Sequence, residues 1–342
     1  MIGWRRTTEF VSTSKNDIYK RVSVVVAIRN EEIFLPGLIR SLQVQNYKNF
    51  ELVLVNDHST DTTRMIMEEA LHYFQNIQLI DAIGIGKKNA LKEGILKAKS
   101  ELIITTDADC IPLSSWIETI LNFSNQFSFD LLICPVKYSD RKSLFAKLQQ
   151  LEFTSLVASG VGAAGSGRPI MCNAANLAFT KKAWLESQKD LHAEEQSGDD
   201  IFLLQSIKKR KGIVRFLRSE FAFVETRPSE TVKSFIKQRR RWASKSTSYA
   251  DWHIIITAVL ILSASLLDLF LMVYSIFNPQ YFILLLLFFC FKYLLDTLLL
   301  INVRHFFKLK KIFLMSLILS VIYPFYIVFV GVSSIITKPK NW

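Results

Sequence analysis

Two carboxylates, Asp107 and Asp109, directly follow an apolar, β-branched segment at residues 102–106. Such a segment predicts a buried strand, and Pro112 prevents that strand from simply continuing. In open α/β sheets, ligands gather beyond the carboxyl ends of the strands. Carboxylate oxygens are hard ligands that suit Mg²⁺ or Mn²⁺, and such an ion can neutralise a departing diphosphate. An Asp-X-Asp pair also occurs in ordinary solvated turns. Only the other motifs of the chain can distinguish a metal site from such a turn.

Other chemically capable residues also follow predicted strands. Asp57 comes after an apolar strand at residues 51–55, and Lys87 and Lys88 begin a helix after a short strand at residues 77–80. Acidic groups and lysines at one sheet edge suit a metal-bound diphosphate that carries a base and a ribose. The alternatives are a helix-capping turn for Asp57 and a solvated helix start for the lysines.

Two later segments offer groups for a second substrate. Asn173 and Asn176 lie in an alternation of small and polar residues that can form the floor of a pocket, or an ordinary strand. Asp199 and Asp200 begin a predicted helix, where the helix dipole favours carboxylates, and one of them could instead be a general base. The glycines of residues 160–165 have the spacing of a dinucleotide fingerprint, but they follow a helical pattern rather than a strand. We therefore expect a flexible loop there, lining an acceptor channel.

A helix start is predicted at residues 228–230, and the helix contains the run Gln238-Arg239-Arg240-Arg241-Trp242. Gln238, Arg241 and Trp242 share one face because they lie three and four residues apart. That face can bind a diphosphate and stack an indole on an acceptor. Arg239 and Arg240 point elsewhere and can meet phospholipid headgroups. A simple interfacial helix is the alternative.

Strand and helix patterns alternate five times after the apolar strand at residues 22–28. This alternation predicts an α/β domain with a parallel sheet and helices on both faces. We expect four regions along the chain: a polar N-terminal segment at 1–20, the α/β domain at 21–228, an interfacial amphipathic helix at 229–252 and a transmembrane region at 253–337.

The transmembrane region contains three apolar segments, each long enough for a bilayer, which needs ~20 residues; they are residues 253–277, 280–301 and 312–337. The basic residues at 302–311 predict a cytoplasmic loop, and the uncharged turn at 278–279 suits the far side. The third segment could instead re-enter, because Pro324 breaks the helix.

Two intramembrane charges should pair. Asp268 and Lys292 lie at similar depths in the first two apolar segments, and buried charges in membranes are usually paired. We therefore expect an ion pair between these segments, with Asp296 on the same helix face as Lys292.

The charge distribution argues against nucleic acid as a partner, although the formal net charge is +12. The basic residues concentrate between positions 208 and 245, just before the first apolar segment, which suits anionic membrane lipids. The first twenty residues lack the apolar core of a signal peptide, so we expect the α/β domain to be cytoplasmic. The cysteines show no paired metal-ligand spacing, which predicts a reduced compartment and no structural zinc.

Together these motifs resemble those of the membrane-associated inverting glycosyltransferases of family 2, whose catalytic domain has the GT-A fold, a Rossmann-like mixed sheet. The motifs occur in family order over residues 22–245 and read Val55-Asn-Asp57, Gly86-Lys87, Asp107-Ala-Asp109, Gly198-Asp199-Asp200 and Gln238-Arg-Arg-Arg241-Trp242. The resemblance implies a nucleotide-diphosphate sugar as donor and Mg²⁺ or Mn²⁺ as cofactor.

The same resemblance implies a role for each motif residue. Asp57 would contact the nucleobase, Asp107 the ribose or diphosphate, and Asp109 the metal. Asp200 would be the catalytic base. The diphosphate and the acceptor end would be held by Gln238, Arg241 and Trp242. Lys87 and Arg241 would stabilise the departing charge, and Asp199 would orient the acceptor or cap the helix.

The chain departs from the processive polysaccharide synthases of this family, because it lacks membrane helices before the catalytic domain and has only three after it. A lipid-linked or glycan acceptor at the cytoplasmic face of a bacterial inner membrane, or its equivalent, therefore fits better. The alternatives are a processive β-polysaccharide synthase that acts as an oligomer or with a partner, and a non-catalytic membrane subunit with the same fold.

Overall fold

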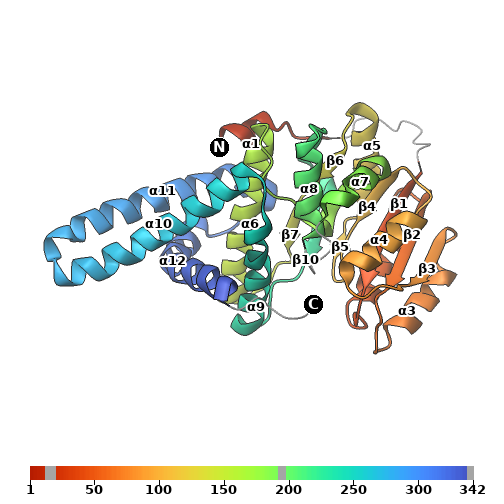
Figure 1. Ribbon diagram of the computed structural model, residues 1–342, viewed down its shortest axis with the longest axis horizontal. Coiled ribbons are helices and arrows are strands. Elements are labelled where there is room, and N and C mark those ends of the chain that lie inside the picture. Colours follow the sequence, from red (N-terminus) through yellow and green to blue (C-terminus); the bar gives the residue numbers. More distant parts are fainter. Residues whose placement is uncertain (12–20, 192–197, 337–342) are drawn as a thin grey trace. The chain divides into compact units, whose positions relative to one another are not determined.

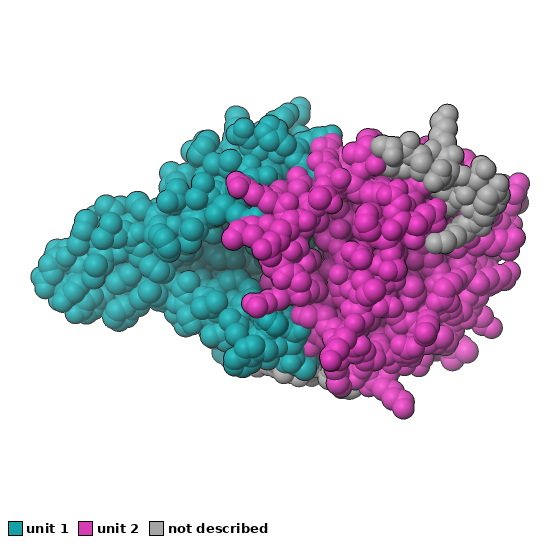
Figure 2. Space-filling view, turned by 90° about the horizontal axis from the view of Figure 1, so that it is seen from above, with its two compact units in different colours: residues 1, 138–162, 228–341 teal, residues 2–137, 163–227, 342 magenta. Residues whose placement is uncertain are grey.

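The computed structural model describes residues 1–11, 21–191 and 198–336, which fall into two compact units (Figures 1 and 2). The first unit in chain order comprises residues 2–137 and 163–227 and contains the α/β domain; it is magenta and marked unit 2 in Figure 2. The second comprises residues 138–162 and the described chain from Pro228 onward; it is teal and marked unit 1. The division falls between residues 227 and 228, and residues 138–162 group with the C-terminal region.

The first unit is built on a seven-stranded sheet of described residues, in the order β3-β2-β1-β4-β8-β6-β9. Its strands are β1 (Val22–Ile28), β2 (Phe50–Asn56), β3 (Ile77–Asp81), β4 (Leu102–Thr105), β6 (Leu131–Ile133), β8 (Leu177–Thr180) and β9 (Val214–Phe216). Every residue of β1 and β2 is buried, as expected for apolar strands covered on both faces.

The sheet is mixed rather than wholly parallel. Neighbours among β1 to β4 pair in parallel, whereas β8 runs antiparallel to both β4 and β6. The five strands of the predicted alternation, β1, β2, β3, β4 and β6, run in one direction as expected, whereas β8 lies outside that alternation and adds an antiparallel strand. The mixed sheet implied by the family resemblance is confirmed.

Helices of the first unit connect these strands, and their bounds are α1 (Ile2–Arg6), α2 (Leu35–Gln43), α3 (Thr63–Glu69), α4 (Lys87–Lys97), α5 (Trp116–Gln126), α7 (Lys181–Ser187) and α8 (Asp199–Lys209). Helix α4 packs on β1 and β2. A Cβ atom at Gly94 would lie 2.7 Å from Val25 and 2.8 Å from Val55, so glycine permits this close approach. The packing fixes the start of α4, where Lys87 lies.

A small second sheet has the order β5-β10-β7, with β5 at Ile111–Pro112, β10 at Val224–Thr226 and β7 at Val136–Tyr138. The chain after β4 thus enters a different sheet at Pro112, as the proline predicted. Strand β7 follows β6 closely along the chain but belongs to this second sheet. Short 3₁₀ turns occur at Ala70–His72, Ala174–Asn176, Gln188–Asp190, Glu220–Ala222, Ser244–Ser248 and Pro279–Tyr281.

The second unit is helical and consists of α6 (Leu144–Gly165, up to residue 162), α9 (Val232–Ala243), α10 (Trp252–Phe277), α11 (Phe282–Phe307) and α12 (Ile312–Ile336). The flexible loop expected at residues 160–165 is wrong, because α6 continues through them. The small residues Ala163 and Ala164 favour a helix, and the first proline comes only at Pro169.

Among the described residues, α10, α11 with the turn before it, and α12 are long and apolar enough to cross a membrane. Helices α10 and α11 lie side by side as a hairpin, and both contact α12 (Figure 1). Helix α12 continues through Pro324. Lys292 Nζ lies 3.2 Å from Asp268 Oδ2, so the predicted ion pair between the first two spans is confirmed.

Candidate functional site

Asp57 occupies the carboxyl end of β2, where its carboxylate is fully buried and bound on several sides. Its Oδ1 accepts a hydrogen bond from Gly86 N at 2.9 Å and lies 3.2 Å from His58 Nδ1. Its Oδ2 lies 3.5 Å from the guanidinium of Arg29. Gly86 has a φ of +100°, a conformation that other residues rarely adopt. The carboxylate therefore joins the ends of β1 and β2 to the start of α4.

Lys87 follows as the first residue of α4 and lies beside the carboxyl end of β4. Its Nζ donates a hydrogen bond to Asp107 Oδ1 at 2.5 Å. Burial alone would lower the pKa of Lys87, but Asp107 and then Asp199 raise it above its usual value. Lys87 is therefore a fixed cation at this edge of the sheet. The neighbouring Lys88 instead donates a hydrogen bond to the Leu191 carbonyl.

Asp107, Asp109 and Cys110 place ligand atoms within 4.8 Å of one another. Burial, then Asp109, raises the pKa of the Cys110 thiol well above its usual value, so the sulfur is a poor ligand. Burial and Asp107 raise the pKa of Asp109. The two carboxylates are close and only partly compensated by Lys87, and this oxygen donor set fits a hard divalent cation.

Glu31 is a further acidic residue of this edge, which the sequence analysis did not assign. Burial, then Asp109 and Asp107, raise the pKa of Glu31 to about 7. Its backbone N donates to Thr63 Oγ1 at 2.8 Å, which fixes the loop after β1 against the start of α3. The pattern that predicted Asp57 could also have predicted Glu31, because both are carboxylates just beyond the carboxyl end of an apolar strand.

The acidic pair Asp199 and Asp200 begins α8, after Gly198 in a left-handed conformation. Asp200 Oδ2 accepts a hydrogen bond from Ala174 N at 3.3 Å, and Cys172 Sγ donates to the Asp200 carbonyl. Both carboxylates are half-buried, and both act electrostatically on Lys87. The structure therefore brings the acidic pair near the lysine and carboxylates at the end of β4.

The two predicted asparagines lie in the same region, but their side chains form hydrogen bonds within the protein. Asn173 caps the turn that follows it by accepting a hydrogen bond from Ala175 N at 3.0 Å. Asn176 is fully buried, accepts from Trp116 Nε1 at 2.8 Å and donates to two backbone carbonyls. Asn176 thus has a structural role, because its hydrogen bonds hold neighbouring segments together.

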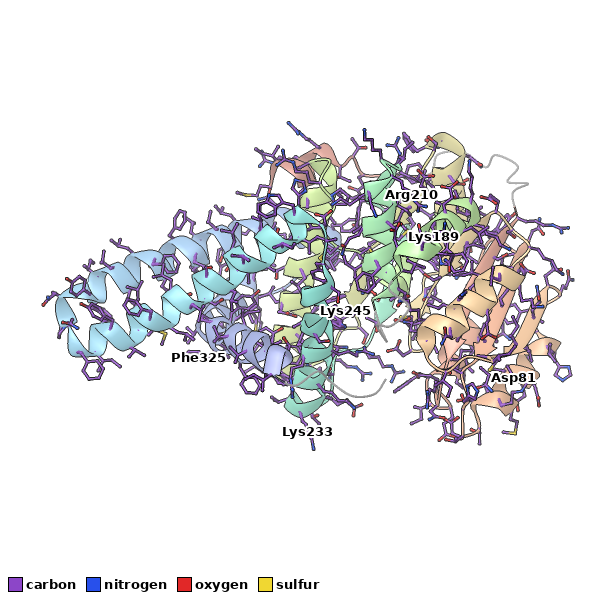
Figure 3. All side chains as sticks on the ribbon, in the orientation of Figure 1. Asp81, Lys189, Arg210, Lys233, Lys245 and Phe325 are labelled. Carbon is purple, nitrogen blue, oxygen red and sulfur yellow. The ribbon has the colours of Figure 1, made fainter. Side chains whose placement is uncertain are left out.

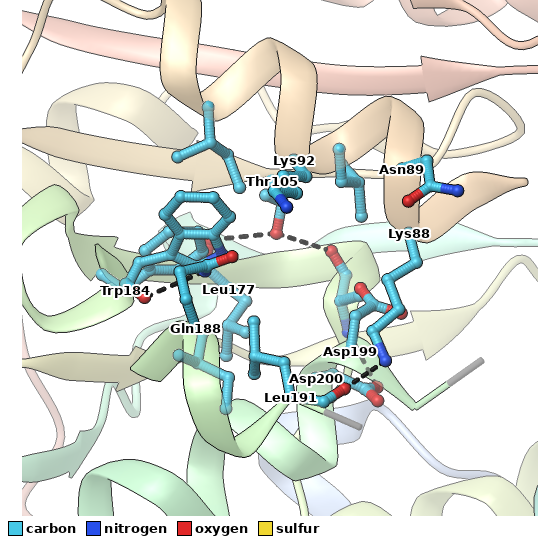
Figure 4. Close-up of a pocket in the computed structure, with 15 residues that line it drawn as sticks. Lys88, Asn89, Lys92, Thr105, Leu177, Trp184, Gln188, Leu191, Asp199 and Asp200 are labelled. Atoms are coloured by element: carbon cyan, nitrogen blue, oxygen red, sulfur yellow. Dashed lines mark hydrogen bonds between the residues drawn. The ribbon is translucent and has the colours of Figure 1, made fainter. Parts of the chain in front are cut away.

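A pocket with a mixed polar and apolar lining includes the acidic pair (Figure 4). Leu177, Trp184 and Leu203 contribute to its wall, and Asp199 and Asp200 line it as well. The side chains drawn there come from α4, β4, β8, α7 and α8 and from the short turns at residues 174–176 and 188–191. The carboxylates of the pair therefore border an apolar surface as well as the charged edge of the sheet.

The run Gln238 to Trp242 lies on α9, in the second unit. Thr231 begins this helix with a capping box to Ser234. The expectation that Arg239 meets phospholipid headgroups is wrong, because its side chain is 3% exposed and pairs with Glu152 at 2.5 Å. Arg240 donates to the Ser333 carbonyl at 3.3 Å. Partners on α6 and α12, of which Glu152 is buried, hold these two arginines.

One family model matches much of the α/β part of the chain. Residues 23–187 match the family model described as glycosyl transferase family 2. This stretch contains Asp57, Lys87, Asp107 and Asp109, together with Asn173 and Asn176, whereas the acidic pair and the run on α9 lie beyond it.

Several proteins of known sequence are similar to parts of the chain. It is 34% identical over 103 residues to an uncharacterized glycosyltransferase of Haemophilus influenzae, covering 30% of this chain and 32% of that protein. It is 37% identical over 94 residues to an undecaprenyl-phosphate 4-deoxy-4-formamido-L-arabinose transferase of Proteus mirabilis, covering 26% and 29%. It is 26% identical over 147 residues to a poly-β-1,6-N-acetyl-D-glucosamine synthase of Staphylococcus epidermidis, covering 42% and 35%. The chain therefore spans about a third of the length of these relatives.

One solved structure resembles the whole chain. The mannosyltransferase PcManGT from Pyrobaculum calidifontis, solved in complex with GDP-Man and Mn²⁺, has a TM-score of 0.61 at 15% identity, covering 99% of this chain and 94% of that one. At this identity the likeness establishes the fold. The expected GT-A domain followed by apolar helices is therefore confirmed.

Proposed function

We propose, on the premise that the chain belongs to glycosyltransferase family 2 through residues 23–187, that the protein transfers a sugar from a nucleotide-diphosphate sugar to an acceptor hydroxyl. The acceptor is lipid-linked or a glycan, at the cytoplasmic face of the membrane. The observation that carries the proposal is the Lys87–Asp107 pair, which lies beside Asp109 and within electrostatic reach of Asp199 and Asp200.

The donor lies at the carboxyl edge of the sheet in this proposal. Asp57 contacts the nucleobase, Asp107 the ribose or diphosphate, and the cationic Lys87 offsets the charge of the leaving diphosphate. Asp109 and Asp107 would hold Mg²⁺ or Mn²⁺, which supplies Lewis-acid neutralisation of the departing phosphate oxygens. The closely spaced carboxylates of Asp107 and Asp109, which Lys87 compensates only in part, support a cation at this place.

The acceptor approaches Asp200. This carboxylate removes the proton from the acceptor hydroxyl, and the oxygen forms a bond to the anomeric carbon while the bond from that carbon to the diphosphate breaks. Attack opposite the leaving group inverts the anomeric configuration, so an α-linked donor gives a β-linked product. Asp199, at the same helix start, orients the acceptor.

Helix α9 supplies the remaining contacts. Gln238 and Arg241 bind the diphosphate, and Trp242 stacks on the acceptor end. Helix α9 belongs to the same compact unit as the three apolar helices, which supports an acceptor that is presented at a membrane. The Proteus mirabilis relative carries undecaprenyl-phosphate in its name, which agrees with such an acceptor.

A processive polysaccharide synthase is the second candidate, because the Staphylococcus epidermidis relative is named as one. Product length separates the candidates: a single transfer adds one sugar to each acceptor, whereas a processive enzyme gives a ladder or a polymer. Binding of sugar nucleotides without any transfer would instead indicate a non-catalytic subunit.

The test is a transfer assay with the purified full chain in lipid nanodiscs. Radiolabelled sugar nucleotides are supplied one at a time with a membrane lipid extract, in Mg²⁺, in Mn²⁺ or in EDTA. We expect metal-dependent label in the lipid or glycan fraction, which Asp200→Asn abolishes. The matched control, Asp140→Asn, changes an exposed aspartate outside the site and should keep the activity. Absence of transfer from every donor, or full activity of Asp200→Asn, would contradict the proposal.

A further inference from the structure

Glu152 and Arg239 form a buried ion pair in the second unit that the proposed function does not use. Their side chains are 4% and 3% exposed, and Arg239 donates to Glu152 Oε2 at 2.5 Å. The other carboxylate oxygen, Oε1, accepts a hydrogen bond from the hydroxyl of Tyr326 at 3.3 Å. The pair therefore links α6, α9 and α12.

The guanidinium of Arg239 also lies against two aromatic rings of its own helix. Its central carbon is 4.2 Å from the ring centroid of Trp242 and 4.7 Å from that of Phe235. Phe153 of α6 lies 6.3 Å from Trp242, centroid to centroid. The indole that the proposed function assigns to the acceptor is thus packed against a fixed cation and a second ring.

The aromatic contacts continue to α12. Tyr326, which bonds to Glu152, lies 5.4 Å from Phe235, centroid to centroid. The adjacent Phe325 is 50% exposed and points outward from α12 (Figure 3). One face of α12 therefore holds the pair, while the other is free to face lipid.

Stability alone does not account for this arrangement. A buried ion pair costs desolvation, and well-packed apolar residues often stabilise a fold equally well or better. Burial alone would lower the pKa of Arg239, but Glu152 raises it, so the arginine is charged. Arginine, unlike lysine, can use its planar group to pair with a carboxylate and stack on rings at once.

We propose that Glu152 and Arg239 are positioning residues that hold the indole of Trp242 in its acceptor-binding orientation and anchor it, through Tyr326, to the apolar helix α12. This inference rests on the proposed function, because it takes Trp242 as an acceptor contact. The pair itself touches no substrate. Its loss should weaken acceptor binding and leave donor binding intact.

Kinetics of the full chain in nanodiscs test this expectation with Glu152→Gln and Arg239→Lys. Arg239→Lys keeps the charge but loses the planar stacking. We expect both variants to raise the acceptor KM about 3- to 30-fold, the range of a cation–π contact, with the donor KM changed less than about twofold. Arg240→Lys, the same change one residue along the helix, should leave both constants unchanged. An unchanged acceptor KM, or equal rises for donor and acceptor, would overturn the inference.

A second readout does not depend on activity. The chain contains six tryptophans, and 5-fluorotryptophan labelling gives each a fluorine NMR signal; the signal of Trp242 is the one lost in Trp242→Phe. We expect this signal to move or broaden in Arg239→Lys and Glu152→Gln, and to stay in place in Arg240→Lys. An unmoved signal would overturn the inference even if the wild type transferred sugar.

Tyr326→Phe removes only the hydroxyl that bonds to Glu152. It can therefore test the inference even if the variants of Glu152 and Arg239 fail to fold. It should shift the same fluorine signal, and a stationary signal would count against the link to α12. A wild-type protein without transferase activity would refute the proposed function, whereas the fluorine signal would still decide the positioning role.

Discussion

Replacing Glu31 by glutamine should stabilise the protein at pH 8 and change its stability much less at pH 5. Burial and the carboxylates Asp109 and Asp107 raise the pKa of Glu31 from about 4.5 to about 7. The folded protein therefore binds this proton more tightly than the unfolded chain does. Stability falls as the pH rises from about 4.5 through about 7, and the penalty is complete above that range. Glutamine keeps the shape and cannot ionise.

The magnitude follows from the same shift. A rise of the Glu31 pKa from 4.5 to about 7 corresponds to roughly 3 kcal/mol, at ~1.4 kcal/mol for each tenfold change in proton affinity. Glu31 is only partly buried, so solvent screening should reduce this to about 1.5–2 kcal/mol. For a domain of this size, that is a rise of about 3 to 8 °C in the thermal midpoint.

Thermal unfolding of the full chain in detergent, at pH 5 and pH 8 and with EDTA present, measures this difference. Glu32→Gln, the exposed neighbouring substitution, is the matched control. Added Mg²⁺ should shrink the gain at pH 8, because a cation at Asp107 and Asp109 offsets the repulsion on ionised Glu31. An equal shift at both pH values, or the same gain from Glu32→Gln, would refute the reasoning.

Three further predictions concern the metal, the membrane pair and the topology. Asp109→Ala should weaken binding of a nucleoside diphosphate in calorimetry when metal is present, and unchanged binding would remove Asp109 from the metal site. Lys292→Met should cost about 2.5–3.5 kcal/mol because it leaves Asp268 unpaired within a membrane span. The double change Lys292→Met with Asp268→Leu should recover most of that loss in SDS titrations, and no recovery would mean that the two charges are not coupled. In cells whose native cysteines are replaced, Asn278→Cys should react with an impermeant reagent and Lys310→Cys should not. The reverse labelling would contradict the predicted orientation.

Local patterns were sufficient where one segment determines its own structure. The unbroken apolar runs of β1 and β2 predicted buried strands, and the carboxylates beyond strand ends predicted the acidic edge. The Asp268–Lys292 pair could be predicted because both residues lie at a similar distance from the turn that joins the two helices. In helices that cross a bilayer, this distance gives the depth of each residue in the membrane.

Long-range pairing was beyond these patterns. Helical periodicity placed Arg239 away from Trp242, and this is wrong, because the guanidinium lies 4.2 Å from the indole centroid. Periodicity also could not show that Glu152, 87 residues earlier, lies buried against Arg239. The direction of β8 likewise depends on its partners β4 and β6, which no local pattern specifies. Contacts of this kind require the folded chain.

Turnover of Asp200→Asn against Asp199→Asn tests the central claim most directly. Both carboxylates begin α8 and both act electrostatically on Lys87, so comparing the two substitutions isolates the contribution of each carboxylate. Losing a positioned base costs on the order of 10²–10⁴ in rate. We predict that Asp200→Asn loses turnover by that factor with nearly normal donor affinity, and that Asp199→Asn loses much less. Near-normal turnover of Asp200→Asn with loss in Asp199→Asn would exchange the two roles, and activity of both variants would contradict acid–base catalysis by this pair.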